Sequence, residues 1–183
     1  MGEKSGYLAA MAALATGADR AIVSQENFTE NDVKQIVKDA IAKVNEGLSH
    51  YTIVKSEGTS EQWSCKRLKD AIKELDKENQ LSVRIDVLCH AQEGGSPSAF
   101  DRQMGLRKAI YAFQGFMNPR KMGDSDCCVL GLVGRTLKFS PVSELVKEVC
   151  FPHRLPLKQW WIPLIPLIGA LSEVKDAIDE EKV

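Results

Sequence analysis

The stretch RAIVSQENFTENDVKQIVKDAIAKVNEGLSHYTIVK, residues 20–55, decides the fold class. Its middle part, Thr29–Glu46, places apolar side chains three or four residues apart, which predicts an amphipathic helix. The flanking segments Arg20–Ser24 and Tyr51–Lys55 are short and apolar, as strands are. Two strands joined by a helix form a parallel pair, because the helix returns the chain to the starting edge of the sheet. The unit therefore predicts an α/β fold.

The same alternation continues on both sides of this unit. Strands are predicted at Ser82–Leu88, Cys127–Val133 and Thr136–Phe139, and the cysteines at 127 and 128 are expected to be buried. Helices are predicted at Gly6–Thr16, Ser64–Lys77, Ser98–Phe116 and Pro141–Glu148, with helical pieces from Lys158 onward. We therefore expect a largely parallel sheet flanked by helices. The chain opens on a helix with no strand before it, so this Rossmann-type lobe is expected to be incomplete.

Composition excludes several classes of protein. The chain has 183 residues and a net charge of −1, from 24 basic and 25 acidic residues, which gives no electrostatic case for nucleic acid or an anionic membrane. No apolar run approaches the roughly 20 residues that span a bilayer. The five cysteines are odd in number and form no CxxC pair, so a disulfide framework or zinc site is not expected. A reducing cytoplasm fits this pattern.

Polar residues follow several of the predicted strands, where open α/β sheets bind their ligands. They are the MGEKSG segment at residues 1–6, Glu57 after the second strand, the loop His90–Glu93, and Arg154 before two tryptophans. Each also has a purely structural interpretation. The glycines can form an ordinary turn, Glu57 can be a solvated carboxylate, and His90 a hydrogen-bonded structural side chain. Arg154 can stack on a tryptophan.

Motifs of the common nucleotide and hydrolase sites are absent. The sequence has no GxxxxGK[ST] loop, no GxGxxG after a strand, no nucleophile elbow and no HExxH. The residues alone therefore indicate an α/β domain with one or more polar loop sites, suited to a small anionic ligand.

Three longer stretches together resemble one family, the eukaryotic ATP-dependent phosphofructokinases. They are MGEKSGYLAAMAALATGAD, VLCHAQEGGSPSAFDR and SPVSELVKEVCFPHRLPLKQWW. Their order and spacing agree with the late portion of the family's C-terminal half, and the similarity covers nearly the whole chain. The family's N-terminal half phosphorylates fructose 6-phosphate with Mg-ATP, and its C-terminal half binds the effector fructose 2,6-bisphosphate.

The resemblance implies a phosphofructokinase-like domain over residues 1–183. Residues 1–118, roughly, would form the sugar-phosphate lobe, and residues 119–183 a C-terminal strand and helices. It implies a cytoplasmic glycolytic protein that forms oligomers and binds fructose 6-phosphate or fructose 2,6-bisphosphate. No cofactor is expected in this chain itself, whereas the full-length family enzyme uses Mg-ATP.

The resemblance also implies a role for individual positions. Glu57 matches a carboxylate that accepts hydrogen bonds from sugar hydroxyls, and Arg154 matches a phosphate-binding arginine. Arg84 matches an arginine that reaches the pocket of a neighbouring subunit. The remaining positions, which match the family's glycine segment and its HxQx phosphate loop, are Met1, Gly2, Glu3, His90, Ala91, Gln92 and Glu93.

Two positions depart from the family pattern. Position 93 is Glu where the family has Arg or Gln, and position 3 is Glu where Arg or Gly is usual. Carboxylates there repel a phosphate dianion, although a protonated His90 would offset part of the repulsion. The family's GGDGS-like and DND-like catalytic segments are not in these residues, so the chain alone is predicted not to phosphorylate fructose 6-phosphate. The alternative is a non-catalytic binding lobe or a structural remnant with a weakened phosphate site.

Overall fold

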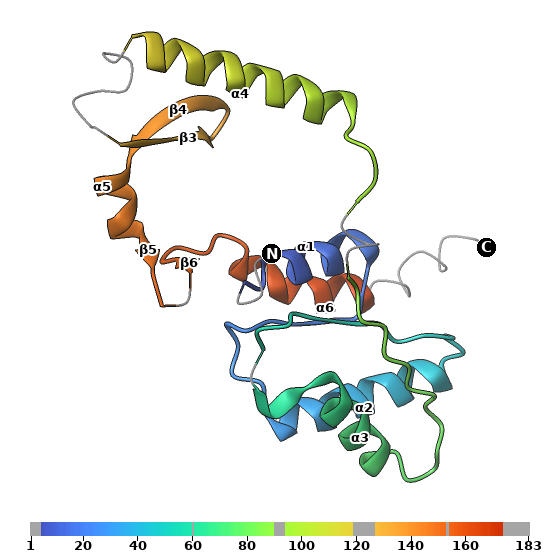
Figure 1. Cartoon of the computed structure of the whole chain (residues 1–183). Coiled ribbons are helices and arrows are strands. Elements are labelled where there is room, and N and C mark those ends of the chain that lie inside the picture. The colour runs from blue at the N-terminus through green and yellow to red at the C-terminus, as the bar shows by residue number, and fades with distance from the viewer. Residues whose placement is uncertain (1–4, 60, 90–93, 119–126, 153, 174–183) are drawn as a thin grey trace. The chain divides into compact units, whose positions relative to one another are not determined.

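The structure is a computed structural model that describes residues 5–59, 61–89, 94–118, 127–152 and 154–173 (Figure 1). The chain divides into two compact units. The first contains residues 1–86, 153–155 and 159–183, and the second contains residues 87–152 and 156–158.

The first unit is built on a short parallel sheet. Strand β1 (Arg20–Ile22) pairs in parallel with β2 (Ile53–Lys55), so that Ala21 lies opposite Val54. Helix α2 (Glu30–Asn45) connects the two strands. The α/β fold class predicted from residues 20–55 is therefore confirmed.

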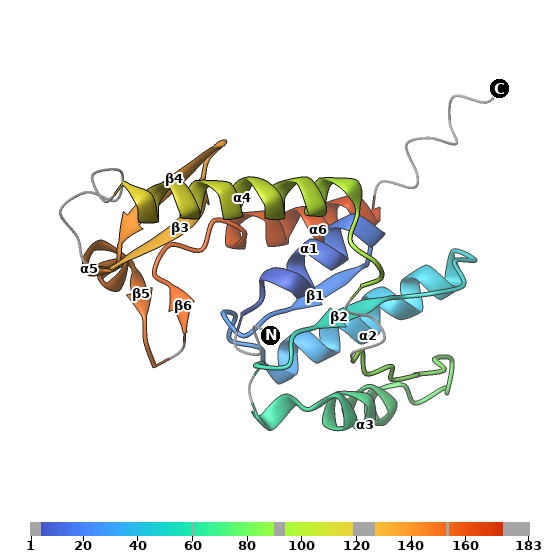
Figure 2. The ribbon, with the colours of Figure 1, turned by 45° about the horizontal axis from the view of Figure 1, so that its top comes forward.

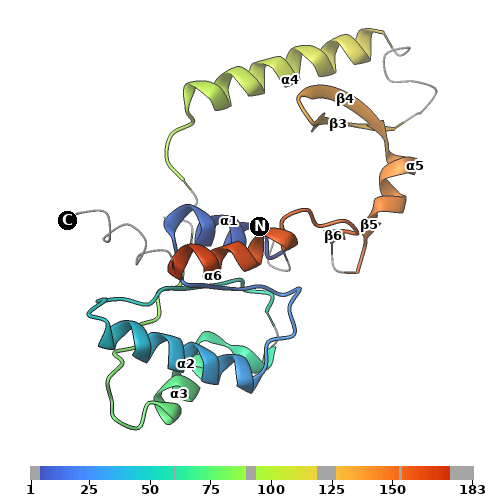
Figure 3. The ribbon, with the colours of Figure 1, turned by 180° about the vertical axis from the view of Figure 1, so that it is seen from behind.

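Helices cover both faces of this sheet. Helices α1 (Tyr7–Thr16) and α6 (Ile165–Glu173) lie on one face, and α2 and α3 (Cys65–Leu75) lie on the other (Figure 2). The view from behind shows the same two pairs (Figure 3). Ile22 is fully buried in the core on the α2 side, and Val23 is fully buried in the core on the α1 side. Two short 3-10 helices, Glu61–Trp63 and Ile162–Leu164, complete the unit, and β6 (Leu155–Pro156) begins in it.

The second unit contains helix α4 (Ala99–Met117) and an antiparallel hairpin of β3 (Cys128–Val133) and β4 (Thr136–Pro141). Helix α5 (Val142–Leu145), a 3-10 turn at Val146–Glu148 and β5 (Val149–Cys150) follow. The Gly115 backbone packs against Phe139, since a Cβ at position 115 would lie 2.4 Å from the phenylalanine ring.

Local sequence signals explain where the two longest helices begin. The Asp32 carboxylate accepts hydrogen bonds from the N–H and hydroxyl of Thr29, at 2.8 and 2.7 Å. Asp101 does the same for Ser98 at the start of α4, again at 2.8 and 2.7 Å. Each carboxylate satisfies a donor that the first helical turn leaves unpaired.

Two expectations about strands are wrong. The segment Ser82–Leu88 forms no strand in the part of the chain that the structure describes. Its alternating residues have the right composition, but a strand needs a ladder partner, and its apolar Val87 is 79% exposed. The strand predicted at Cys127–Val133 forms as β3, from Cys128 to Val133, but it is not buried, because Val129 and Leu132 are exposed, as is Cys127 just before it.

Candidate functional site

The turn that follows β2 places Glu57 at the carboxyl end of the parallel sheet. The Glu57 side chain is exposed, whereas its neighbours Ser56 and Thr59 are buried. The Ser56 N–H donates to the carbonyl oxygen of Ile22 at 2.9 Å, which ties the turn to the end of β1. An open carboxylate is therefore held by a rigid base at the edge where parallel sheets bind ligands.

Two hydroxyl groups fix this turn from inside. The Thr59 hydroxyl oxygen lies 2.8 Å from the Ser56 carbonyl oxygen, 3.0 Å from the Ser56 hydroxyl and 3.3 Å from the Ile22 carbonyl oxygen. Neither Ser56 nor Thr59 was predicted from the sequence. Their signal was the run SEGTS, in which small hydroxyl residues flank a glycine directly after a strand.

The start of helix α1 packs against the same end of β1. A Cβ at Gly6 would lie 2.5 Å from the Val23 Cβ, closer than real Cβ contacts allow. Only glycine fits, and the N-terminal end of α1 is thereby held at the carboxyl end of β1. The free N–H groups of a helix N-terminus favour an anion. The structure thus brings the helix start and the Glu57 turn to one edge of the sheet.

Two predicted arginines are described by the structure. Arg84 is exposed, in the segment that forms no strand, and Arg154 is exposed with a left-handed backbone, φ 54°. Such a conformation costs a non-glycine residue about 1–2 kcal/mol and is concentrated at functional sites. Within the described residues, no ion pair or hydrogen bond joins Glu57, Arg84 and Arg154, and Arg154 stacks on no tryptophan ring.

The other predicted site residues lie outside the described residues. They are Met1, Gly2, Glu3, His90, Ala91, Gln92 and Glu93. The next described residue is Gly94, whose φ of 135° is open to glycine only, and the chain then reaches the Ser98 cap of α4. This positive φ explains why position 94 is a glycine, and the sequence pattern GGSP is typical of such a turn.

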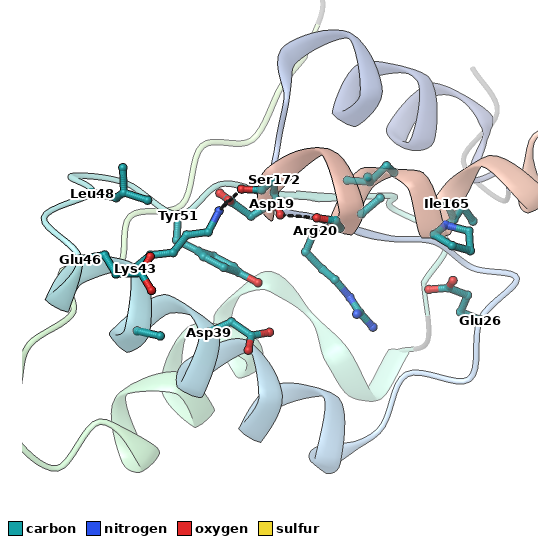
Figure 4. A pocket seen from close by; sticks show the side chains of 15 residues that line it. Asp19, Arg20, Glu26, Asp39, Lys43, Glu46, Leu48, Tyr51, Ile165 and Ser172 are labelled. Carbon is teal, nitrogen blue, oxygen red and sulfur yellow. Dashed lines mark hydrogen bonds and ion pairs between the residues drawn. The ribbon is translucent and has the colours of Figure 1, made fainter. Parts of the chain in front are cut away.

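A cavity of about 530 Å³ lies elsewhere in the first unit, and none of the residues predicted to form a binding site lines it (Figure 4). Asp19 closes one end, where its carboxylate accepts a hydrogen bond from the Thr52 N–H at 2.6 Å and pairs with Lys43. Burial, with the nearby carboxylates of Asp39 and Asp19, raises the pKa of Tyr51 to about 12. Burial also raises the pKa of Glu26. These residues are far apart in sequence, so no local pattern marks them.

The described residues show no metal-binding cluster and no membrane-spanning helix. They contain no cluster of three or more histidine, cysteine or acidic side chains that would hold a metal ion. None of their helices is both long and apolar enough to cross a bilayer.

Comparison with known proteins assigns the chain to a family. The family model described as Phosphofructokinase matches residues 1–116. ATP-dependent 6-phosphofructokinase 2 of Caenorhabditis elegans is 41% identical over 174 residues, which are 94% of this chain and 23% of that protein. The human platelet-type ATP-dependent 6-phosphofructokinase is 35% identical over 98% of this chain and 24% of its own length.

Two solved phosphofructokinase structures share the fold of this chain. Phosphofructokinase from Saccharomyces cerevisiae superposes with a TM-score of 0.78 at 23% identity, over 92% of this chain and 23% of that chain, which shows a shared fold. Phosphofructokinase of Pichia pastoris in the T-state superposes with a TM-score of 0.72 at 26% identity, over 91% of this chain and 21% of that chain. The chain spans about a quarter of the length of the curated relatives that it matches. With the family match and these relatives taken together, the chain belongs to the phosphofructokinase family.

Proposed function

We propose that this chain is a sugar-phosphate-binding lobe of a 6-phosphofructokinase, the glycolytic enzyme that converts fructose 6-phosphate to fructose 1,6-bisphosphate. The observation that carries the proposal is Glu57, an exposed carboxylate on a turn tied to the ends of β1 and β2. Two carboxylate oxygens suit the vicinal hydroxyls of a sugar. The ligand is fructose 2,6-bisphosphate if the lobe is regulatory, and fructose 6-phosphate if it is a substrate lobe.

The phosphate groups would be held by cationic and N–H donors around this edge. The N-terminal end of α1, fixed by Gly6 against Val23, supplies N–H groups. Arg154 supplies a guanidinium. Its backbone is left-handed, a conformation that the surrounding structure must maintain. By resemblance alone, the first and last positions of the HxQx loop, His90 and Glu93, are proposed to face a phosphate. Arg84 is proposed to reach the pocket of a neighbouring subunit, which requires an oligomer.

Phosphoryl transfer is not assigned to this chain. The relatives are named as ATP-dependent enzymes, and such chemistry needs carboxylates that hold Mg²⁺ beside the phosphates. The family's GGDGS-like and DND-like segments, which would supply this machinery, are not in the sequence of this chain. We expect a coupled assay with fructose 6-phosphate and Mg-ATP to show no turnover by the chain alone. Turnover would contradict the proposal that this chain binds the sugar phosphate without transferring a phosphoryl group.

Titration calorimetry with fructose 2,6-bisphosphate tests the binding site. The variant Glu57→Gln keeps the shape of the side chain and removes its charge, so affinity is expected to fall about 10-fold, in line with hydrogen bonds to charged groups. Glu144→Gln, at an exposed carboxylate on α5, is the matched control and should leave affinity unchanged. Equal affinities for the native chain and both variants would contradict the role of Glu57.

The alternative is a lobe whose phosphate site is weakened by Glu3 and Glu93, both outside the described residues. Repulsion between carboxylate and phosphate predicts that Glu93→Gln tightens binding of fructose 2,6-bisphosphate. Undetectable binding by both native chain and Glu93→Gln, with the fold intact by circular dichroism, would favour a structural remnant.

A further inference from the structure

A smaller hollow, of about 320 Å³, lies in the second unit between helix α4 and the β3–β4 hairpin. Its lining residues come from both elements, Arg107, Ile110 and Tyr111 from α4 and Arg135, Thr136 and Leu137 from the hairpin. Ligand pockets have volumes of about 300–1,000 Å³, so the size of this hollow suits a small molecule. It shares no residue with the candidate site around Glu57, which lies in the first unit.

The two walls of the hollow meet at Phe139 of β4. The Phe139 ring lies 6.2 Å from the Tyr111 ring, centroid to centroid, and the Gly115 backbone packs against it. Figures 1 and 3 both show α4 beside the hairpin. Arg107 lies one helical turn before Tyr111 and so on the same face of α4. The contact at Phe139 therefore turns the Arg107 face of the helix toward the hairpin.

The hairpin presents Arg135 on a tight turn. Val133 pairs with Thr136, so that only Gly134 and Arg135 connect the two strands. Gly134 has a φ of 60°, which glycine adopts without strain. The Thr136 hydroxyl donates to the Val133 carbonyl oxygen at 3.2 Å, across the base of the turn. The backbone that carries Arg135 is thus fixed by the hairpin itself.

The charges in the hollow are both positive. Arg107 and Arg135 are exposed, and no acidic side chain among the described residues lines the hollow with them. Within the same described part of the chain, neither guanidinium takes part in an ion pair. An anion bound in the hollow would offset the repulsion between the two side chains. Guanidinium groups bind phosphate through pairs of parallel N–H···O bonds.

We propose that this hollow binds a small phosphate monoester, with the phosphate on Arg107 and Arg135. A phosphate monoester carries a charge near −2 and three acceptor oxygens, enough for two guanidinium groups, whereas a carboxylate carries a single charge. The organic part of the ligand lies against Ile110, Tyr111 and Leu137. Ile110 and Tyr111 are 48% and 42% exposed, so their side chains are open to an apolar or aromatic group. This site does not depend on the proposed sugar-phosphate site.

Titration of the full chain with phenyl phosphate, followed by heteronuclear NMR, tests the proposal. The side-chain Nε–H signals of Arg107 and Arg135 should shift together and saturate with one dissociation constant, of about millimolar size. Inorganic phosphate lacks the apolar part, and benzoate carries only one charge. Each of these two anions should bind at least about 5-fold more weakly than phenyl phosphate.

Single variants test the two arginines. Arg107→Gln and Arg135→Gln should each weaken phenyl phosphate about 10-fold, because each loses a charge-assisted hydrogen bond. Arg102→Gln on α4 and Lys138→Gln on β4 are the matched controls, since both residues are exposed and neither lines the hollow. These controls should change the affinity less than about 2-fold. All four side chains lie at the surface, so the variants should keep the fold, which thermal unfolding verifies.

Two results would overturn the proposal. The first is that millimolar phenyl phosphate shifts neither arginine Nε–H signal. The second is that Arg102→Gln and Lys138→Gln weaken binding as much as Arg107→Gln and Arg135→Gln do, because the attraction would then be a general one to positive charge. Glu57→Gln separates this hollow from the proposed sugar-phosphate site and should leave the shifts of Arg107 and Arg135 unchanged.

Discussion

Lys43 of α2 and Asp19 at the start of β1 form an ion pair with little exposure to solvent, the side chains being 17% and 8% exposed. The Asp19 carboxylate also accepts from the Thr52 N–H, and the Lys43 ammonium also donates to the Ser172 carbonyl oxygen at 3.0 Å. One carboxylate and one ammonium thus join β1, β2, α2 and α6. This pair lines the cavity of about 530 Å³.

Removal of Asp19 should strongly destabilise the first unit. Asp19→Ala leaves Lys43 without its partner and the Thr52 N–H unpaired, which we expect to lower the free energy of unfolding by about 3 kcal/mol. Urea denaturation followed by tryptophan fluorescence reports on this unit alone, because all 3 tryptophans lie in it. Arg67→Ala removes an exposed ion pair with Glu74 at 3.7 Å and should cost less than about 0.5 kcal/mol. Equal losses of unfolding free energy in the two variants would show that the buried ion pair contributes no more to stability than the exposed one.

Gly6 should not tolerate alanine. The added Cβ would meet the Val23 side chain at 2.5 Å, so Gly6→Ala should cost about 1–3 kcal/mol through overpacking. Gly169→Ala on α6 is the matched control, because nothing lies within 4 Å of its added Cβ. Alanine is the better helix former, so this control should gain up to about 1 kcal/mol. Thermal unfolding of both variants measures the difference, and a stabilising Gly6→Ala would show that α1 does not press on β1.

Loss of the Thr59 hydroxyl should lower both the stability of the fold and the affinity of the candidate site for its ligand. Thr59→Val removes a buried group that contacts the Ser56 carbonyl oxygen at 2.8 Å, at an expected cost of about 1–3 kcal/mol. The loosened turn should also weaken fructose 2,6-bisphosphate binding at Glu57. Thr59→Ser retains the hydroxyl and should restore most of the affinity. If valine and serine bind the ligand equally well, the turn does not position Glu57.

Tyr51 should make the protein sensitive to strong alkali. Its pKa is raised from 10.0 to about 12 in the folded chain, chiefly by burial. Between these values the unfolded chain releases the phenol proton while the folded chain keeps it, so stability is full below pH 10 and falls as pH rises through 12. The tyrosinate absorbance lost in Tyr51→Phe should titrate near pH 12, and this variant should flatten the alkaline decline. A difference titration centred near pH 10 would contradict the shift.

Much of the first unit could be predicted from local sequence. Thr29 and Asp32 mark the start of α2 because a helix start is determined by side chains within one turn. The strand predicted at Ser82–Leu88 failed for the opposite reason, since strand formation depends on a partner that alternation within the segment does not reveal. The cavity was not predicted because Asp19, Lys43 and Tyr51 meet only after folding. Glu57 was found by its place after a strand, although nothing local identified Thr59 as its support.

The Asp19–Lys43 pair also bears on the order in which the chain acquires its structure. Asp19, Lys43 and Thr52 lie within one short stretch, whereas the Ser172 carbonyl oxygen that completes the group is 129 positions from Lys43. Contacts this distant in sequence close slowly, because the intervening loop must first be brought together. During synthesis from the N-terminus, β1, α2 and β2 can pair while α6 is still inside the ribosome. The arrival of Ser172 is then a late step of maturation, and until that step Asp19 and Lys43 hold β1, β2 and α2 together without α6.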